Sequence, residues 1–205
     1  MNYYLNNDLI EVGLDECARG CLFGRIYAAA VIFPKENNNN NKLEKIINDS
    51  KKISKKKREL LFDYIKERAL DYSICWIDNN EIDKKGIQYC NMKLFQDCIQ
   101  KLKLKSDYYL IDGTQYKPFN NVPHKCIKKG DTKYINIAAA SILAKVAHDN
   151  YIKELVNNNI ELEKYDLLNN MGYGTKKHRD AIIQYGITKY HRISYKPCNL
   201  YNIVK

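Results

Sequence analysis

The sequence predicts an α/β fold, built on one mixed β-sheet that is flanked by helices and followed by a C-terminal helical extension. Strand-like apolar runs alternate with segments of helical periodicity over the first 150 residues. From about residue 152 the chain becomes more polar and irregular. The length of 205 residues suits one domain with an appendix. We therefore expect a core domain over residues 1–151 and an extension over residues 152–205 that packs on it.

Two strands are expected at the start of the chain. Leu9, Val12 and Leu14 belong to the first strand, and the run from Ile26 to Phe33 forms the second. The polar run from Asn37 to Asn41 has nothing to bury, so we expect a disordered loop there and assign it no function.

Helices and strands then alternate toward the middle of the chain. Residues 55–70 are expected to form a helix that Ser54 can cap, and Tyr72 to Ile77 a third strand. Residues 89–103 repeat apolar side chains at intervals of four, which predicts a second helix. Tyr108 to Ile111 is a short apolar run and is expected to form the fourth strand.

The remaining elements end the core and form the extension. A fifth strand is expected near Cys126, and a long helix begins after Asp131. The buried stripe of that helix is expected to hold Ile135, Ile142 and Val146. In the extension, Thr175 caps the start and Gly186 the end of a helix from Lys176 to Tyr185.

Composition limits the partners and the compartment. Lysine and arginine outnumber acidic residues 34 to 24, a net charge of +10, which fits a polyanionic partner and a plain solvated surface equally well. The seven cysteines are scattered without a Cys-x-x-Cys pair, which is typical of reduced thiols in an intracellular, cytoplasmic protein. Cys17 and Cys21 lack a second pair and make a poor zinc site. No apolar run approaches the roughly 18 to 20 residues of a membrane-spanning helix, so no membrane partner is expected.

Acidic residues occur where predicted strands end or a helix begins. Asp15 and Glu16 lie at the end of the first strand, Asp112 ends the fourth, and Asp131 precedes the long helix. Singly, each is also typical of a solvated turn or a helix start. Together they would bring four carboxylates to one edge of the sheet, and such a cluster needs cations to stay ionised. Oxygen ligands favour Mg²⁺ or Mn²⁺, and two such ions suit phosphodiester cleavage.

Six sequence blocks give the chain a close resemblance to one known family. They occur in the family's order and span nearly the whole chain. The blocks are GLDECARG (13–20), DSKKISKKKRELLFDYI (49–65), YLIDG (109–113), KKGDTKYINIAAASILAKVAHD (128–149), GYGTKKH (172–178) and YHRISYKP (190–197). On these motifs the chain resembles the type 2 ribonucleases H, the ribonuclease HII family.

This resemblance implies a fold, a reaction and a set of catalytic residues. The fold is a ribonuclease H-like mixed sheet flanked by helices, which makes residues 1–151 the catalytic domain. The implied reaction hydrolyses the RNA strand of an RNA/DNA hybrid, or cuts on the 5′ side of a ribonucleotide in duplex DNA. Its products carry a 3′-hydroxyl and a 5′-phosphate. The implied ligands of two divalent ions, Mg²⁺ or Mn²⁺, are Asp15, Glu16, Asp112 and Asp131.

The resemblance also implies the contacts that recognise the substrate. A ribonuclease that distinguishes RNA from DNA has to sense the 2′-hydroxyl. In the family, main-chain groups of the turn after the acidic pair do this, and a tyrosine stacks under a sugar. The corresponding residues here are Cys17, Ala18, Arg19, Gly20 and Tyr173. The candidate phosphate contacts, each equally a solvated cation, are Arg19, Lys51, Lys129 and Arg192. His178 and His191 are expected to have structural roles.

One departure from the family pattern bears on specificity. Ala18 stands where the family has the first glycine of a Gly-Arg-Gly turn. If this turn needs a positive φ, the added Cβ costs on the order of 1 kcal/mol and can hold a phosphate further from the main chain. An enzyme restricted to RNA tracts is therefore one alternative, and a hybrid-binding protein with weak catalysis is another. We expect a monomer without an obligatory protein partner.

Overall fold

A five-stranded mixed sheet forms the centre of the molecule. The computed structural model describes residues 1–35, 42–48, 50 and 53–201, so the expected loop from Asn37 to Asn41 lies outside the described residues. The strands are β1 (Glu11–Cys17), β2 (Ile26–Ile32), β3 (Asp71–Ile77), β4 (Tyr108–Asp112) and β5 (His124–Ile127). Their order is β3-β2-β1-β4-β5. β1 pairs antiparallel with β2 and parallel with β4, which makes the sheet mixed as predicted.

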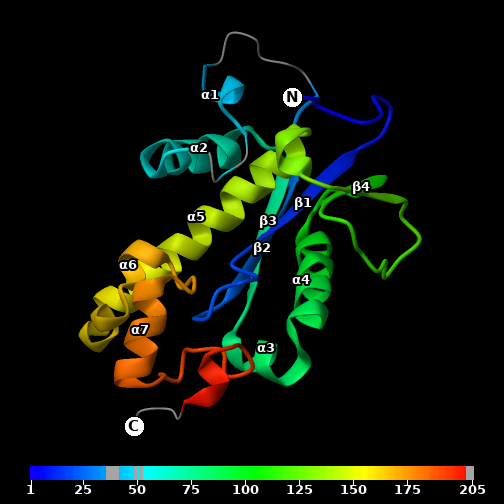
Figure 1. The fold of residues 1–205 in the computed structure, drawn as a ribbon. Helices are drawn as coiled ribbons and strands as arrows, with labels where there is room; N and C mark the ends of the chain where they lie inside the picture. Colours follow the sequence, from blue (N-terminus) through cyan, green and yellow to red (C-terminus); the bar gives the residue numbers. More distant parts are fainter. Residues whose placement is uncertain (36–41, 49, 51–52, 202–205) are drawn as a thin grey trace.

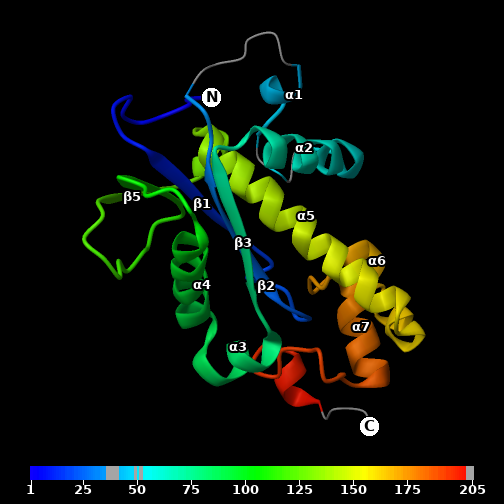
Figure 2. The same ribbon diagram turned by 180° about the vertical axis from the view of Figure 1, so that it is seen from behind.

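Helices cover both faces of this sheet (Figures 1 and 2). α5 (Ile135–Asn157) and α2 (Lys55–Arg68) pack on one face, and α4 (Ile87–Lys101) packs on the other, preceded by α3 (Asn79–Lys85). Side chains of a strand alternate between faces. Accordingly, Tyr27, Ala29 and Val31 of β2 join the core under α5, and the even-numbered residues of β2 join the core under α4.

The start of α5 is held tightly against β1. A Cβ on Gly13 would lie 2.2 Å from the backbone carbonyl carbon of Asn136, so only glycine permits this approach. The Asn136 side chain donates from Nδ2 to the carbonyl of Glu11 and accepts at Oδ1 from the backbone N–H of Phe33. These buried hydrogen bonds fix α5 relative to the sheet, and with it every side chain that α5 presents at the end of β1.

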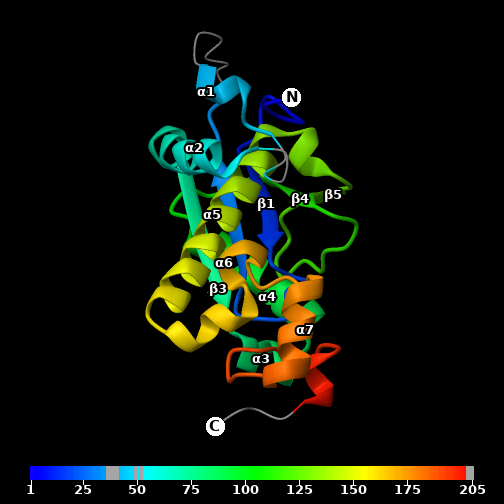
Figure 3. The same cartoon turned by 60° about the vertical axis from the view of Figure 1, so that its left-hand side comes forward.

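The C-terminal part packs on the far end of α5 and on the segment after β1 (Figure 3). It contains α7 (Lys176–Tyr185), the short helix α6 (Leu167–Asn170) and the 3₁₀ helices η2 (Ile160–Tyr165) and η3 (Cys198–Leu200). Its apolar core includes Leu22 and Phe23 from the segment between β1 and β2. α5 continues past residue 151, so the predicted division into residues 1–151 and 152–205 falls inside one helix and stays a prediction.

Most predicted elements are present with small shifts of their ends. α2 ends at Arg68, two residues before the predicted end, and Ser54 occupies its N-cap position without a capping hydrogen bond from its side chain. α7 has the predicted bounds, and the Thr175 hydroxyl accepts the backbone N–H of His178 as expected. α3, the four-residue helix α1 (Lys42–Lys45), α6 and the 3₁₀ helices were not predicted. Within the described residues, no helix is long and apolar enough to cross a membrane.

Candidate active site

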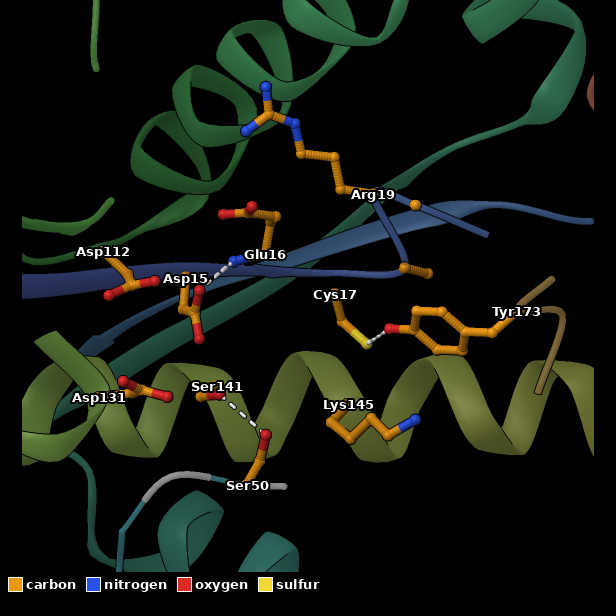
Figure 4. A pocket seen from close by; sticks show the side chains of 12 residues that line it. Asp15, Glu16, Cys17, Arg19, Ser50, Asp112, Asp131, Ser141, Lys145 and Tyr173 are labelled. Atoms are coloured by element: carbon orange, nitrogen blue, oxygen red, sulfur yellow. Dashed lines mark hydrogen bonds between the residues drawn. The ribbon is translucent and has the colours of Figure 1, made fainter. Parts of the chain in front are cut away.

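A pocket of about 440 Å³ opens at the end of β1, between the sheet and α5 (Figure 4). It brings together the four predicted carboxylates, the turn from Cys17 to Gly20 and the predicted tyrosine, Tyr173. The pocket is lined by Asp15, Glu16, Cys17, Ala18, Arg19, Gly20, Ser50, Asp112, Asp131, Ser141, Lys145 and Tyr173. Residues from six separate segments thus meet in one place.

Asp15 and Glu16 lie at the end of β1, as predicted, just before its last residue Cys17. Successive strand side chains point to opposite faces. Asp15 therefore lies on the α5 side and is 5% exposed, whereas Glu16 lies on the α4 side and is half-buried. The pair thus reaches two sides of the sheet, which a simple surface turn would not do.

Asp112 and Asp131 come from two neighbouring segments. Asp112 is the last residue of β4, and Asp131 belongs to the 3₁₀ helix η1 (Gly130–Thr132) just before α5. The Asp112 Oδ1 atom accepts the backbone N–H of Gly130 at 2.6 Å. A Cβ on Gly130 would lie 2.5 Å from Cδ1 of Ile137, so a larger residue here would displace the tip of that side chain. The two carboxylates are therefore placed by backbone geometry.

Mutual repulsion and burial destabilise the charge of this cluster. Burial, followed by the negative charges of Glu16 and Asp112, raises the pKa of Asp15 well above its ordinary value. A hydrogen bond from Ser141 opposes this shift. Among the described residues, no three acidic, histidine or cysteine side chains are drawn together as a ready-made metal site. The donors are nevertheless all carboxylate oxygens, which is the set that suits Mg²⁺ or Mn²⁺.

The turn after the acidic pair has the strained conformation that its sequence suggested. Ala18 has a φ of +69°, in the left-handed region that glycine prefers, and its side chain is buried. Arg19 and Gly20 are exposed at the tip of the turn. The backbone N–H of Cys21 donates to the carbonyl of Ala18 at 3.2 Å and closes the turn. The chain thus carries a Cβ where the backbone disfavours one.

Comparison with known proteins decides the family. A family model described as ribonuclease HII matches residues 12–198. The chain belongs to the ribonuclease HII family. A ribonuclease HII from Bacteroides thetaiotaomicron is 42% identical over 192 residues, which cover 94% of this chain and 92% of that relative. This family member is a ribonuclease H, a metal-dependent endonuclease that acts on RNA/DNA hybrids.

Solved structures of similar fold agree with the architecture. The ribonuclease H2 of Pyrococcus horikoshii superposes with a TM-score of 0.76 at 22% identity, covering 93% of this chain and 95% of that one. The ribonuclease HII in a PCNA complex from Archaeoglobus fulgidus gives a TM-score of 0.75 at 24% identity, covering 92% and 96% of the two chains. The predicted ribonuclease H-like fold is confirmed.

One predicted phosphate contact of this ribonuclease HII is wrong. Arg192 is 0% exposed and cannot touch a bound duplex directly. Its guanidinium donates from Nε to the carbonyl of Gly24 and from Nη1 to the carbonyl of Arg19. The Tyr195 hydroxyl donates to the same carbonyl of Arg19 at 2.8 Å. Arg192 therefore supports the turn from behind, because its guanidinium joins the carbonyl of Arg19 in the turn to the carbonyl of Gly24.

The other predicted basic contacts have different surroundings. Arg19 and Lys129 are both exposed, as a phosphate contact requires; Arg19 lines the pocket, and Lys129 lies two residues before Asp131 in the chain. Lys129 has a φ of +56° and precedes η1 directly. Lys51 lies outside the described residues. The roles of these side chains toward a duplex stay predictions.

Tyr173 lies on the far side of the turn from the carboxylates (Figure 4). Its hydroxyl is 4.0 Å from the Cys17 sulfur, and its ring is half-buried. Burial raises the pKa of the Cys17 thiol to about 12, so this cysteine stays protonated and is no nucleophile. Cys21 pairs in an isolated β-bridge with Tyr173, which joins the turn to the C-terminal part.

A buried histidine pair extends this connection. The Thr188 N–H donates to Nδ1 of His191, so the proton of this imidazole sits on Nε2. That Nε2 lies 3.2 Å from Nε2 of His178, which must accept, and Nδ1 of His178 then donates to the carbonyl of Tyr173 at 3.0 Å. Both rings are neutral, and burial lowers the pKa of each. The expectation of structural histidines agrees with this chain of hydrogen bonds.

Sequence reasoning missed three polar residues of the pocket. Ser50 and Ser141 share a hydroxyl hydrogen bond of 3.0 Å, and Lys145 donates to Asp149 while its ammonium lies 5.5 Å from the Tyr173 ring centre. Ser141 and Lys145 are four residues apart on α5, so they share one face of that helix. Polar residues at that spacing on an otherwise apolar stripe were the signal that could have identified them.

Proposed function

We propose that this ribonuclease HII cleaves the RNA strand of RNA/DNA hybrids and also cuts on the 5′ side of a ribonucleotide embedded in duplex DNA. The products would carry a 3′-hydroxyl and a 5′-phosphate. One observation supports this most directly: the four carboxylates share a pocket with the turn from Cys17 to Gly20 and with Tyr173. The residues proposed for cleavage thus lie next to those proposed for recognition of the ribose.

Asp15, Glu16, Asp112 and Asp131 are the groups that would hold two divalent ions, Mg²⁺ or Mn²⁺. The donor set fits these ions because burial and the repulsion among the carboxylates, which together raise the pKa of Asp15, are offset by bound cations. Two such ions, when bound, supply an activated water and stabilise the charge that develops on the leaving oxygen.

The chain's own residues orient the carboxylates and the substrate. The Gly130 N–H holds Asp112 by its Oδ1 atom and leaves the second oxygen available. Ser141 hydrogen-bonds Asp15, which favours the ionised form that a metal ligand needs. Arg19 and Lys129 are exposed cations that suit phosphate oxygens and carry no sequence information.

Recognition of the ribose is assigned to the turn and to Tyr173. Arg19 and Gly20 are exposed residues of the turn, and their backbone N–H groups are the proposed donors to the 2′-hydroxyl, which can accept them. The Tyr173 ring, with its hydroxyl directed toward Cys17, offers a flat apolar face for the neighbouring sugar. The net charge of +10 favours association with an RNA/DNA hybrid and with a DNA duplex alike, because both are polyanions.

A second candidate is an enzyme restricted to RNA tracts, and the conformation of Ala18 favours it. A methyl group at φ +69° stands in the turn that would approach the phosphate and the 2′-hydroxyl most closely. A third candidate, a hybrid-binding protein with weak catalysis, is disfavoured because all four carboxylates are present in the pocket.

The test is cleavage of a labelled RNA/DNA hybrid, with analysis of the product ends. We expect cuts in the RNA strand only with Mg²⁺ or Mn²⁺, leaving 5′-phosphates that a phosphatase removes, and no cuts with Asp131→Asn. Isothermal titration of the same two proteins with Mn²⁺ gives an independent reading of metal binding. Cleavage that survives a chelator, or that leaves 5′-hydroxyl ends, would contradict the proposal.

A further inference from the structure

A second groove lies beside the catalytic pocket, on the α4 side of the sheet. It has a volume of about 110 Å³ and shares three residues with the catalytic pocket: Glu16, Arg19 and Asp112. Its other walls come from α4 and from the loop after β4, namely Gln88, Asn91, Met92, Gly113, Thr114 and Gln115. In Figure 4 the Arg19 side chain extends to this side, away from α5. The acidic cluster thus separates two recesses.

Asn91 is the unusual residue of this groove. Its side chain is 8% exposed, and its Oδ1 atom is buried without a hydrogen-bond partner among the described residues. Buried amide groups almost always have a partner, because an unpaired one loses its hydration without compensation. Rotation of the amide about its last torsion exchanges oxygen and nitrogen, so the group can present an acceptor or a donor to the groove.

The other buried asparagines among the described residues contrast with Asn91. Asn136 donates to the carbonyl of Glu11 and accepts from Phe33. Asn170 donates to the carbonyl of Tyr165 and accepts from the backbone N–H of Gly172. Asn79 donates to the carbonyls of Lys189 and His191. Each of these three amides joins two segments of the fold, whereas Asn91 lies next to the catalytic carboxylates with no such partner.

The chemistry of the lining suits a sugar. Amides and a hydroxyl supply neutral donors and acceptors of the kind that hydrogen-bond sugar hydroxyls, and Arg19, which also lines the groove, suits the phosphate that adjoins such a sugar. Met92 adds a flexible apolar surface of the kind that packs against a ring. The volume is well below the roughly 300 Å³ at which pockets for whole small molecules begin, so only part of a nucleotide enters.

We propose that this groove receives the sugar of the nucleotide on the 5′ side of the scissile phosphate, and that Asn91 hydrogen-bonds its 2′-hydroxyl. The inference rests on the proposed function, in which the turn and Tyr173 hold the ribonucleotide on the 3′ side. A strand that crosses the carboxylates then places its preceding nucleotide on the α4 side. Asn91 is a second ribose sensor, and it favours RNA tracts over single ribonucleotides.

The experiment compares two duplexes that differ in one oxygen atom. One contains a single ribonucleotide, and the other also has a ribonucleotide directly 5′ of it. We measure kcat/KM for the same cut, 5′ of the shared ribonucleotide, with products resolved to the nucleotide. The wild-type enzyme should prefer the second duplex by about tenfold, the size of one hydrogen bond. Asn91→Leu should lose this preference, so that its kcat/KM values for the two duplexes become equal.

Gln100→Leu is the matched control, because it makes the same kind of change at an exposed position of α4. It should keep the preference, and thermal melting of all three proteins checks their folding. A preference that survives in Asn91→Leu would come from duplex shape and would overturn the inference. Equal kcat/KM values of the wild-type enzyme on both duplexes would also overturn the inference. This result needs no variant, so the inference can be tested even if Asn91→Leu does not fold. Failure of the wild-type enzyme to cut either duplex would instead reject the proposed function.

Discussion

The histidine pair predicts a pH dependence of stability that one substitution should remove. His191 is 1% exposed, and burial beside His178 lowers its pKa from 6.5 to about 3. The folded state therefore binds fewer protons than the unfolded state between these two values. Stability is intact above pH 6.5 and is lost progressively as the pH falls toward 3. Between pH 7.5 and pH 5.0 this single group costs roughly 2 kcal/mol.

The assay is urea unfolding at pH 7.5 and pH 5.0, with linear extrapolation to water. In His191→Asn the amide oxygen can still accept the Thr188 N–H, but the side chain no longer titrates. We expect the variant to be less stable at pH 7.5, because Nε2 of His178 loses its partner, and to lose about 2 kcal/mol less than wild type on acidification. His124→Asn at the half-buried start of β5 is the control and should follow wild type. If the unfolding free energy of His191→Asn and of wild type fell equally on acidification, the account of a neutral, hydrogen-bonded histidine pair would be refuted.

Three further substitutions test other parts of the site. Ala18→Gly removes a methyl from a backbone at φ +69°, so cleavage at single ribonucleotides should rise relative to long hybrids; equal ratios in variant and parent would reject this. Arg192→Met should lower the unfolding free energy by about 2–4 kcal/mol, because the carbonyls of Arg19 and Gly24 lose a buried donor, and unchanged urea unfolding would contradict the supporting role. Asp15→Asn should abolish cleavage. It should also raise the melting temperature of the metal-free protein, because it removes a buried charge that Glu16 and Asp112 repel. A lower melting temperature of the variant in EDTA would contradict this explanation.

The sequence was sufficient for the sheet and for the positions of the carboxylates. The strands read from apolar runs all exist, and Asp112 ends β4 as its position before Gly113 indicated. These features depend on local pattern, which a single sequence records directly. The strained turn was also foreseen, because an alanine in a glycine-type turn has a predictable conformational cost.

What the sequence did not reveal depends on contacts between distant segments. Arg192 looks like a surface cation in sequence, and only packing shows that its guanidinium is buried behind the turn, 173 residues from its partner Arg19. Ser50 and Ser141 meet across 91 residues, and the unpaired Oδ1 of Asn91 follows from the absence of a partner among the described residues. Such contacts depend on tertiary structure, and the local periodicity of the sequence does not predict them.

The C-terminal part helps to hold the turn from Ala18 to Gly20 in its conformation. The segment from Cys21 to Gly24 lies between two C-terminal stretches, with backbone hydrogen bonds from Leu22 to Gly172 and from Gly24 to Tyr190. The histidine pair and Arg192 add side-chain bonds to the same region. A turn held from several sides keeps its strained conformation, because the surrounding structure determines it.

The most direct test of the account is the position and metal dependence of cleavage in two labelled duplexes. One is DNA with a single ribonucleotide and the other is a continuous RNA/DNA hybrid, each with Mg²⁺, Mn²⁺ or EDTA, and with Asp112→Asn as the control. The account predicts metal-dependent cuts in the RNA strand of the hybrid and a cut 5′ of the lone ribonucleotide, all absent in the variant. Cleavage by Asp112→Asn at the wild-type rate, or no cleavage of either duplex by the wild-type protein with metal, would contradict it.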